Sequence, residues 1–117
     1  MSAKTFDLIC APHLSAILVC ALRDYVAIEY PPGVGDCALV AREALLDVAA
    51  RIESGCAQQA RVTLSRRLRS LMKVALNFYC DQRATTSGVE QARPLLLQSL
   101  QGEAVDDRCL AALSPRA

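Results

Sequence analysis

The chain has 117 residues, with 13 basic and 12 acidic side chains and one histidine. This length fits a single domain, residues 1–117, and an apolar content of 53% is enough for a core. Aromatic residues make up only 4% and Trp is absent, which favours close-packed helices over a β-sandwich or barrel. Small apolar side chains bury little area each, so such a domain is expected to need a partner copy.

The first helix is expected over residues 7–28, beginning near Asp7 or Pro12, after a loose terminus over 1–6. Its apolar run, residues 8–22, resembles a signal peptide but lacks a clear small-x-small cleavage site. Arg23 and Asp24 end the run too early for a membrane span. We therefore predict a buried helix and no membrane span.

A loop over residues 30–35, rich in Pro and Gly, is expected to fold the next element back on the first helix. Between Asp36 and Gly88 there is no proline and one glycine, Gly55, so good helix formers predict one very long helix over 36–82. Gly55 either marks a close packing contact or breaks this helix in two. We favour continuity because the apolar pattern keeps its phase across Gly55. A short third helix is predicted over 88–100, followed by a frayed tail over 101–117.

On such a helix, apolar and polar residues separate into two faces. The apolar face predicts a seam for a second helix, formed by Ala57, Ala60, Leu64, Leu68, Leu71 and Ala75. The opposite face carries Arg51, Gln59, Thr63, Arg66, Arg69, Ser70 and Lys73.

Charge is concentrated in the same stretch. From Arg51 to Lys73 there are six basic residues and one acidic residue, a local net charge of +5, whereas the rest of the chain has a net charge of −4. Such a stripe is either a solvated helix surface or a track for a polyanion. Double-stranded RNA is recognised by shape, through phosphates and 2′-hydroxyls, which suits a face of cations, hydroxyls and amides. No aromatic residues line the stripe, which argues against single-strand binding.

Signatures of catalysis and metal binding are weak. The six cysteines, at positions 10, 20, 37, 56, 80 and 109, include no C-x-x-C pair, and His13 is the single histidine. The cysteines have apolar neighbours, so we expect reduced, buried thiols. The sequence predicts no catalytic residue, no metal ligand and no cofactor, and hence a protein that is not an enzyme.

The run from Cys56 to Leu71, CAQQARVTLSRRLRSL, resembles the central helix of the nodavirus double-stranded-RNA-binding suppressors of RNA silencing. The resemblance covers roughly residues 8–80, and includes a similar amino-terminal helix and a Pro-containing loop. The positions in this run that match the family's pattern are Cys56, Thr63, Ser65, Arg66, Ser70 and Leu71.

The resemblance implies an all-α fold: a helical hairpin with one very long helix, pairing as an antiparallel dimer into a four-helix bundle on one side of an RNA duplex. Arg66 matches the arginine on which the family depends most for RNA binding, Cys56 a cysteine facing the duplex, and Arg61 a lysine. The chain departs from the family at Gln59, which replaces a lysine. It also departs at Asp47-Val48, where the family has paired arginines; Arg51, one turn further on, is the candidate substitute.

The predicted RNA-binding residues are therefore Arg51, Cys56, Gln59, Arg61, Thr63, Arg66, Arg69, Ser70 and Lys73. The predicted function is sequence-independent sequestration of long duplexes and small interfering RNA in the host cytoplasm by a homodimer, as a viral suppressor of RNA silencing. Whether a host silencing protein such as Dicer is also bound is left open. The alternative is a small helical protein–protein interaction module, such as a phage or bacterial inhibitor or an immunity protein, that binds no nucleic acid.

Overall fold

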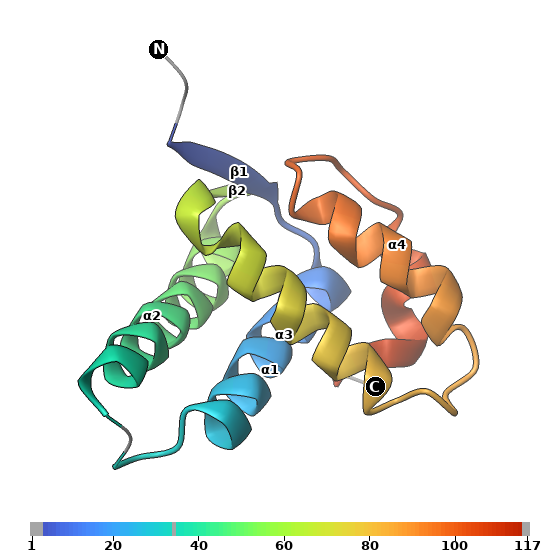
Figure 1. Ribbon diagram of the computed structural model, residues 1–117. Coiled ribbons are helices and arrows are strands. Elements are labelled where there is room, and N and C mark those ends of the chain that lie inside the picture. Colours follow the sequence, from blue (N-terminus) through green and yellow to red (C-terminus); the bar gives the residue numbers. More distant parts are fainter. Residues whose placement is uncertain (1–3, 34, 116–117) are drawn as a thin grey trace.

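A computed structural model describes residues 4–33 and 35–115 and shows a mostly helical chain with a small two-stranded sheet (Figure 1). The predicted helical class is therefore confirmed, whereas the sheet was not predicted. In chain order the elements are β1 (Thr5–Ile9), α1 (Pro12–Glu29), α2 (Asp36–Gln58), β2 (Arg61–Ser65), the 3-10 turn η1 (Arg66–Leu68), α3 (Arg69–Asp81), α4 (Val89–Ser99) and the 3-10 segment η2 (Asp107–Leu113).

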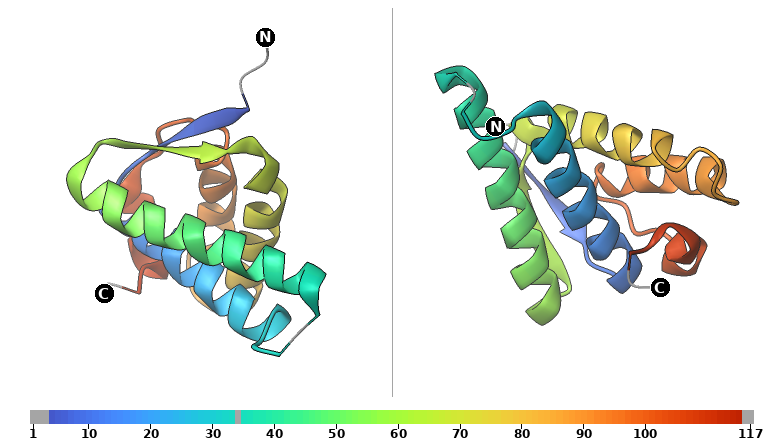
Figure 2. Two further views of the ribbon diagram at one scale, coloured as in Figure 1. Left: turned by 90° about the vertical axis from the view of Figure 1, so that its left-hand side faces the viewer. Right: turned by 90° about the horizontal axis from the view of Figure 1, so that it is seen from below.

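Helix α1 begins at Pro12, the later of the two predicted starts. Proline suits this position because its missing N–H would have no partner in the first turn, and its fixed φ matches the helix. Helices α1 and α2 pack side by side and are joined by the segment around residues 30–35 (Figure 2). Within the described ranges, no helix combines the length and apolar character that crossing a bilayer requires.

The predicted single helix over 36–82 is wrong. Helix α2 ends at Gln58, and residues 61–65 form β2, which pairs antiparallel with β1. The reason lies in the alternation of Arg61–Ser65, where apolar Val62 and Leu64 are two residues apart. In a helix these two side chains would point about 200° apart, whereas in a strand they share one face. Both are buried, as are Phe6 and Leu8 opposite them in the ladder.

Gly55 does not break α2, which runs through it for three more residues. Its function is close packing: a Cβ atom at this position would lie 2.5 Å from Cγ2 of Val62. The absence of a side chain at Gly55 therefore lets β2 fold back directly along the end of α2. Of the two alternatives for this glycine, the structure shows the close contact.

Gly55→Ala is expected to lower the free energy of unfolding by about 1–3 kcal/mol, because Val62 or the strand must shift to make room. Urea denaturation monitored by circular dichroism would measure the loss. Gly35→Ala is the matched control, since a Cβ there meets no atom within 4 Å. Adding Val62→Ala to Gly55→Ala should restore part of the loss in a double-mutant cycle, and additive losses would contradict the proposed contact.

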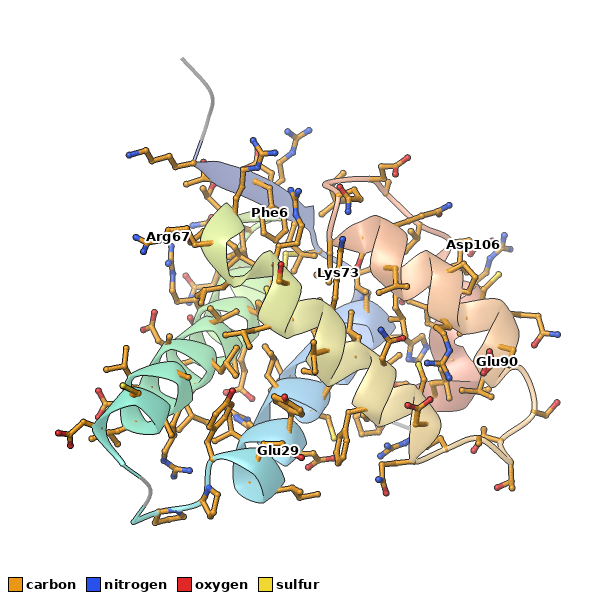
Figure 3. All side chains as sticks on the ribbon, in the orientation of Figure 1. Phe6, Glu29, Arg67, Lys73, Glu90 and Asp106 are labelled. Atoms are coloured by element: carbon orange, nitrogen blue, oxygen red, sulfur yellow. A yellow bond between two sulfur atoms is a disulfide. The ribbon has the colours of Figure 1, made fainter. Side chains whose placement is uncertain are left out.

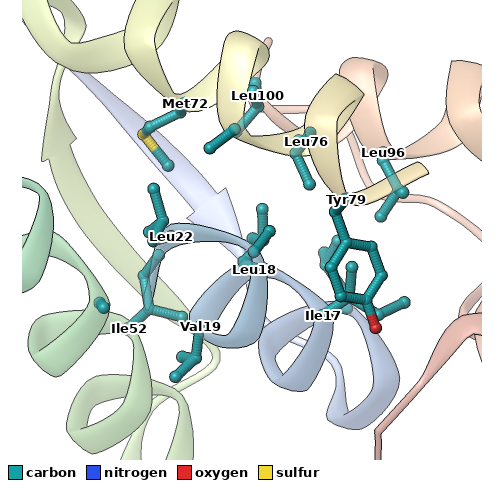
Figure 4. Close-up of a cluster of buried hydrophobic side chains, with 14 of the residues drawn as sticks. Ile17, Leu18, Val19, Leu22, Ile52, Met72, Leu76, Tyr79, Leu96 and Leu100 are labelled. Carbon is teal, nitrogen blue, oxygen red and sulfur yellow. The ribbon is translucent and has the colours of Figure 1, made fainter. Parts of the chain in front are cut away.

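The core lies between α1, α2, α3 and α4, with α1 at its centre (Figure 4). Leu18 and Leu22 of α1 face Met72 and Leu76 of α3, while Ile52 closes the core from α2. Figure 4 also shows Ile17, Val19, Tyr79, Leu96 and Leu100. Burial of this apolar surface is the main source of stability.

The carboxy-terminal segment is not a frayed tail where the structure describes it. In η2, Leu110 and Leu113 are buried, and the hydroxyl of Tyr79 donates a hydrogen bond to the carbonyl of Leu113. The carboxylate of Asp107 accepts the backbone N–H groups of His13 and Leu14 at 3.0 and 2.8 Å. It thus satisfies two donors at the start of α1 that have no partner inside the helix.

The predicted dimer seam is not a continuous stripe in this fold. Leu64 and Ala75, at 1% and 0% exposure, are buried inside the single chain, and Leu68 and Leu71 are half-buried against the same core. Ala57 and Ala60 are exposed near the end of α2. The seam depended on one helical phase from Ala57 to Ala75, and the turn and strand after Gln58 interrupt that phase.

Candidate nucleic-acid interface

Basic side chains gather at the end of the molecule formed by the strand pair and the start of α3. Figure 3 shows Arg67 and Phe6 at this end and the labelled Glu29 and Glu90 away from it, with Lys73 between Phe6 and Asp106 in the same view. We call this region the cationic surface and define it by Lys4, Arg51, Arg61, Arg66, Arg67, Arg69 and Lys73. These residues come from β2, η1, α3, the turn of α2 facing β2, and the residue before β1.

The outer face of the sheet contributes hydroxyl groups to this surface. Residues directly opposite each other in an antiparallel pair share a face, and the register places Thr5 opposite Ser65, Asp7 opposite Thr63, and Ile9 opposite Arg61. The Thr63 hydroxyl donates to the Asp7 carboxylate at 2.8 Å, and Arg61 lies 3.9 Å from the same carboxylate. At 68% and 50% side-chain exposure, this ion pair is weak.

Arg51 reaches the surface from α2. Its Nη2 donates to the backbone carbonyl of Thr63 at 3.0 Å, which joins the helix to β2. A guanidinium group has five N–H donors in a fixed fork. One such bond therefore positions the group and leaves donors for a phosphate oxygen.

The 3-10 turn after β2 places Arg66 and Arg67 in exposed positions. Ser65 starts this turn, because its hydroxyl accepts the N–H of Arg67 at 3.2 Å, the usual function of serine at the start of a helix. The N–H of Arg66 donates to the carbonyl of Lys4 at 3.0 Å. This bond brings Lys4, which lies outside the predicted helices, against the turn that carries Arg66 and Arg67.

Arg69 opens α3 and lies over the ring of Phe6, with its Cζ atom 4.7 Å from the ring centroid. Its Nε atom is buried and makes no hydrogen bond within the described part of the chain. The ring attracts the guanidinium through its quadrupole. The stack therefore holds a half-buried cation in a fixed position beside the exposed Arg66 and Arg67. Ser70 and Lys73 follow on the first turns of α3, Ser70 exposed and Lys73 half-buried.

Two predicted RNA-binding residues lie elsewhere. Cys56 forms a disulfide bond with Cys10, with 5.3 Å between their Cα atoms, and Gln59 lies in the turn after α2. The prediction of reduced thiols is therefore wrong for Cys10 and Cys56. Cys20, Cys37, Cys80 and Cys109 are free thiols, but Cys37 and Cys109 are exposed rather than buried. Partners 46 residues apart leave no spacing signal in the sequence, so the pairing could not be deduced from it.

Cys56 and Gln59 line a groove of about 650 Å³ between α1 and the end of α2. Here Arg23 makes two hydrogen bonds of 3.0 and 3.1 Å to Glu53, which lower the pKa of Glu53 and raise the pKa of Arg23. The Cys20 thiol lies 3.5 Å from the Asp24 carboxylate. Burial and then the Asp24 charge raise the pKa of Cys20, so this thiol stays protonated at neutral pH.

The structure thus brings Arg51, Arg61, Thr63, Arg66, Arg69, Ser70 and Lys73 to this end of the molecule, and places Cys56 and Gln59 on the groove beside α1. It adds Lys4 and Arg67 to the predicted set. Arg67 could have been found from its position next to Arg66, whereas Lys4 joins the site only through the strand register. No group of three or more His, Cys, Asp or Glu side chains that could hold a metal ion occurs among the residues that the structure describes.

Comparison with known proteins gave no match to a protein-family model, a curated protein or a solved structure.

Proposed function

We propose that this protein binds double-stranded RNA without sequence preference through the cationic surface. The observation that carries the proposal is the gathering of seven basic side chains at one end of a chain whose total net charge is only +1. Phosphate contacts by Lys and Arg supply most of the affinity in binding that does not depend on sequence. In this arrangement, Arg66 and Arg67 would be central phosphate contacts, with Arg51, Arg61 and Lys73 around them.

The neighbouring hydroxyls support duplex RNA as the partner. Thr5, Thr63 and Ser70 are exposed beside the cations, and short hydroxyls can meet the 2′-hydroxyls of an A-form minor groove. Proteins that hold single strands instead stack bases on exposed aromatic rings. The aromatic ring at this end, Phe6, is 8% exposed and lies under Arg69.

The biological consequence would be that implied by the resemblance: sequestration of long duplexes and small interfering RNA from a host silencing machinery in the cytoplasm, without catalysis. Arg61, Thr63 and Arg66 of the resembling run lie on the cationic surface and support this extension. The extension does not use a four-helix bundle. A homodimer would have to form through a surface other than the predicted seam, since Leu64 and Ala75 are buried. Whether a host protein such as Dicer is also bound stays open.

Replacing two central cations tests the proposal. Arg66→Gln/Arg67→Gln is expected to weaken binding of duplex RNA of arbitrary sequence about 10- to 100-fold, because two charge-assisted phosphate contacts are lost. A plot of log affinity against log salt should become shallower by about two. Both would be measured by gel shift or fluorescence anisotropy over a series of salt concentrations, with far-ultraviolet circular dichroism to verify the fold.

The matched control is Arg23→Gln/Arg108→Gln, which removes the same charge from exposed sites outside the cationic surface. We expect little change in affinity from the control. Equal losses for the two double variants would mean that net charge alone drives binding, and no RNA binding by the native chain would refute the proposal.

Exposed apolar residues favour protein–protein docking as a second candidate. Ile28 near the end of α1 and Leu39 and Val40 near the start of α2 are 58%, 43% and 70% exposed. Apolar side chains that share one region of a surface are typical of contacts with another protein. If the native chain binds no duplex RNA at low salt, this candidate becomes the preferred one.

A further inference from the structure

The Cys10–Cys56 bond lies at the base of the sheet that carries part of the cationic surface. Cys10 directly follows β1, and Cys56 is in the last turn of α2, just before the turn into β2. The N–H of Cys10 also donates to the carbonyl of Ala60 at 2.8 Å, which continues the pairing beyond Ile9 and Arg61. The disulfide therefore fixes β1 against the segment that leads into β2.

The sheet is small, and the bond lies at one end of it. It has two strands of five residues. A strand pair of this size is only marginally stable by itself, so its stability comes from the packing of Phe6, Leu8, Val62 and Leu64 on the core and from the disulfide at its end. When β1 opens, Arg69 loses the ring of Phe6, and Arg61 and Thr63 lose the Asp7 carboxylate.

Both cysteines are accessible from outside. Each is half-buried, and both line the solvent-open groove between α1 and α2. The free thiol in the same groove, Cys20, is a poor internal nucleophile because it stays protonated, and the thiolate is the reactive form. The open groove admits a thiol from outside the chain.

From this geometry we infer that Cys10–Cys56 is a site of thiol–disulfide exchange with an external dithiol, and that its reduction loosens the strand pair and weakens the cationic surface. One thiolate of the dithiol attacks a sulfur of the Cys10–Cys56 bond and forms a mixed disulfide. The second thiol of the reductant then displaces the protein sulfur. The dithiol leaves as a cyclic disulfide, and Cys10 and Cys56 each gain one electron and one proton.

This inference rests in part on the proposed function, because the affinity that it concerns is affinity for duplex RNA. It also connects the function with compartment, since disulfides are rare in a reducing cytosol and persist in oxidising environments. In a reducing compartment the binding surface would be in its looser form, and oxidation would tighten it.

The experiment compares oxidised and dithiothreitol-reduced full-length protein in a Cys37→Ser/Cys109→Ser background, which removes the two exposed thiols. One readout is affinity for duplex RNA, and the second is amide hydrogen exchange of each element, which needs no RNA. Reduction should weaken RNA binding about three- to tenfold, because a surface that must first be ordered binds less tightly. It should also increase exchange by local opening in β1 and β2, measured without denaturant, whereas α1 and α3, which exchange through global unfolding, follow only the loss of overall stability.

Cys10→Ser/Cys56→Ser should behave like the reduced protein and not respond to dithiothreitol, and reoxidation should restore the native values. If neither form binds RNA but exchange rises selectively in the two strands, the proposed function fails while the exchange site stands. Unchanged exchange and affinity would overturn the inference. Loss of helicity on reduction, or faster exchange through global unfolding in every element with no added local opening of β1 and β2, would also overturn it.

Discussion

Leu64→Asp is expected to unfold the protein rather than to separate two copies of it. Leu64 is 1% exposed, lies opposite Phe6 in the strand pair and belongs to the core. A carboxylate at this position would be buried without a partner, which costs several kcal/mol. Small domains are stable by only about 5–15 kcal/mol. Thermal unfolding followed by circular dichroism should therefore show a large loss of stability or no folded state, while light scattering reports the mass of any folded fraction.

Ala57→Asp is the matched control, because the long-helix prediction places both residues on one seam. In the structure Ala57 is exposed, so the same charge should change stability by at most about 1 kcal/mol, mainly through its position near the helix end. If Ala57 and Leu64 instead lay on one helical seam, both variants would stay folded and both would lose the dimer. A folded, fully helical Leu64→Asp variant would contradict the burial of β2.

The helices follow from properties that are local in the sequence. Composition and the scarcity of proline predict a helical chain, Pro12 fits the first position of α1, and α4 over Val89–Ser99 lies within the predicted third helix. The strands do not follow in this way. Runs of five residues such as Thr5–Ile9 and Arg61–Ser65 are too short to distinguish the two-residue period of a strand from the 3.6-residue period of a helix. What decides between strand and helix is pairing between segments far apart in the chain, here reinforced by the Gly55–Val62 contact.

In the candidate site, too, some features follow from the local sequence and others from contacts between distant segments. That Arg66, Arg67 and Lys73 reach the surface could be expected, since Lys and Arg are rarely buried. Which residues accompany them depends on the fold. Cys56 is joined to Cys10 by a disulfide and, with Gln59, lines the groove beside α1, and the hydrogen bond from Arg66 to Lys4 brings in the amino terminus. A helical projection has no information on either contact, because each joins residues in different elements.

Removing the disulfide is the second change with a large expected effect. Cys10→Ser/Cys56→Ser should lower the free energy of unfolding by about 4 kcal/mol, because the bond closes a long loop and so restricts the unfolded chain. The two cysteines are 46 residues apart in sequence. Urea denaturation should show a lower midpoint, and a somewhat larger m-value because the unfolded chain becomes less compact.

Cys37→Ser/Cys109→Ser removes two exposed thiols and should leave stability within about 0.5 kcal/mol. A loss of less than about 1 kcal/mol from Cys10→Ser/Cys56→Ser would contradict the expected cross-link effect. A loss of the expected size leaves part of a typical domain stability of about 5–15 kcal/mol. The reduced chain would then stay folded, which is the condition under which reversible exchange at Cys10–Cys56 can act on the strand pair and the cationic surface.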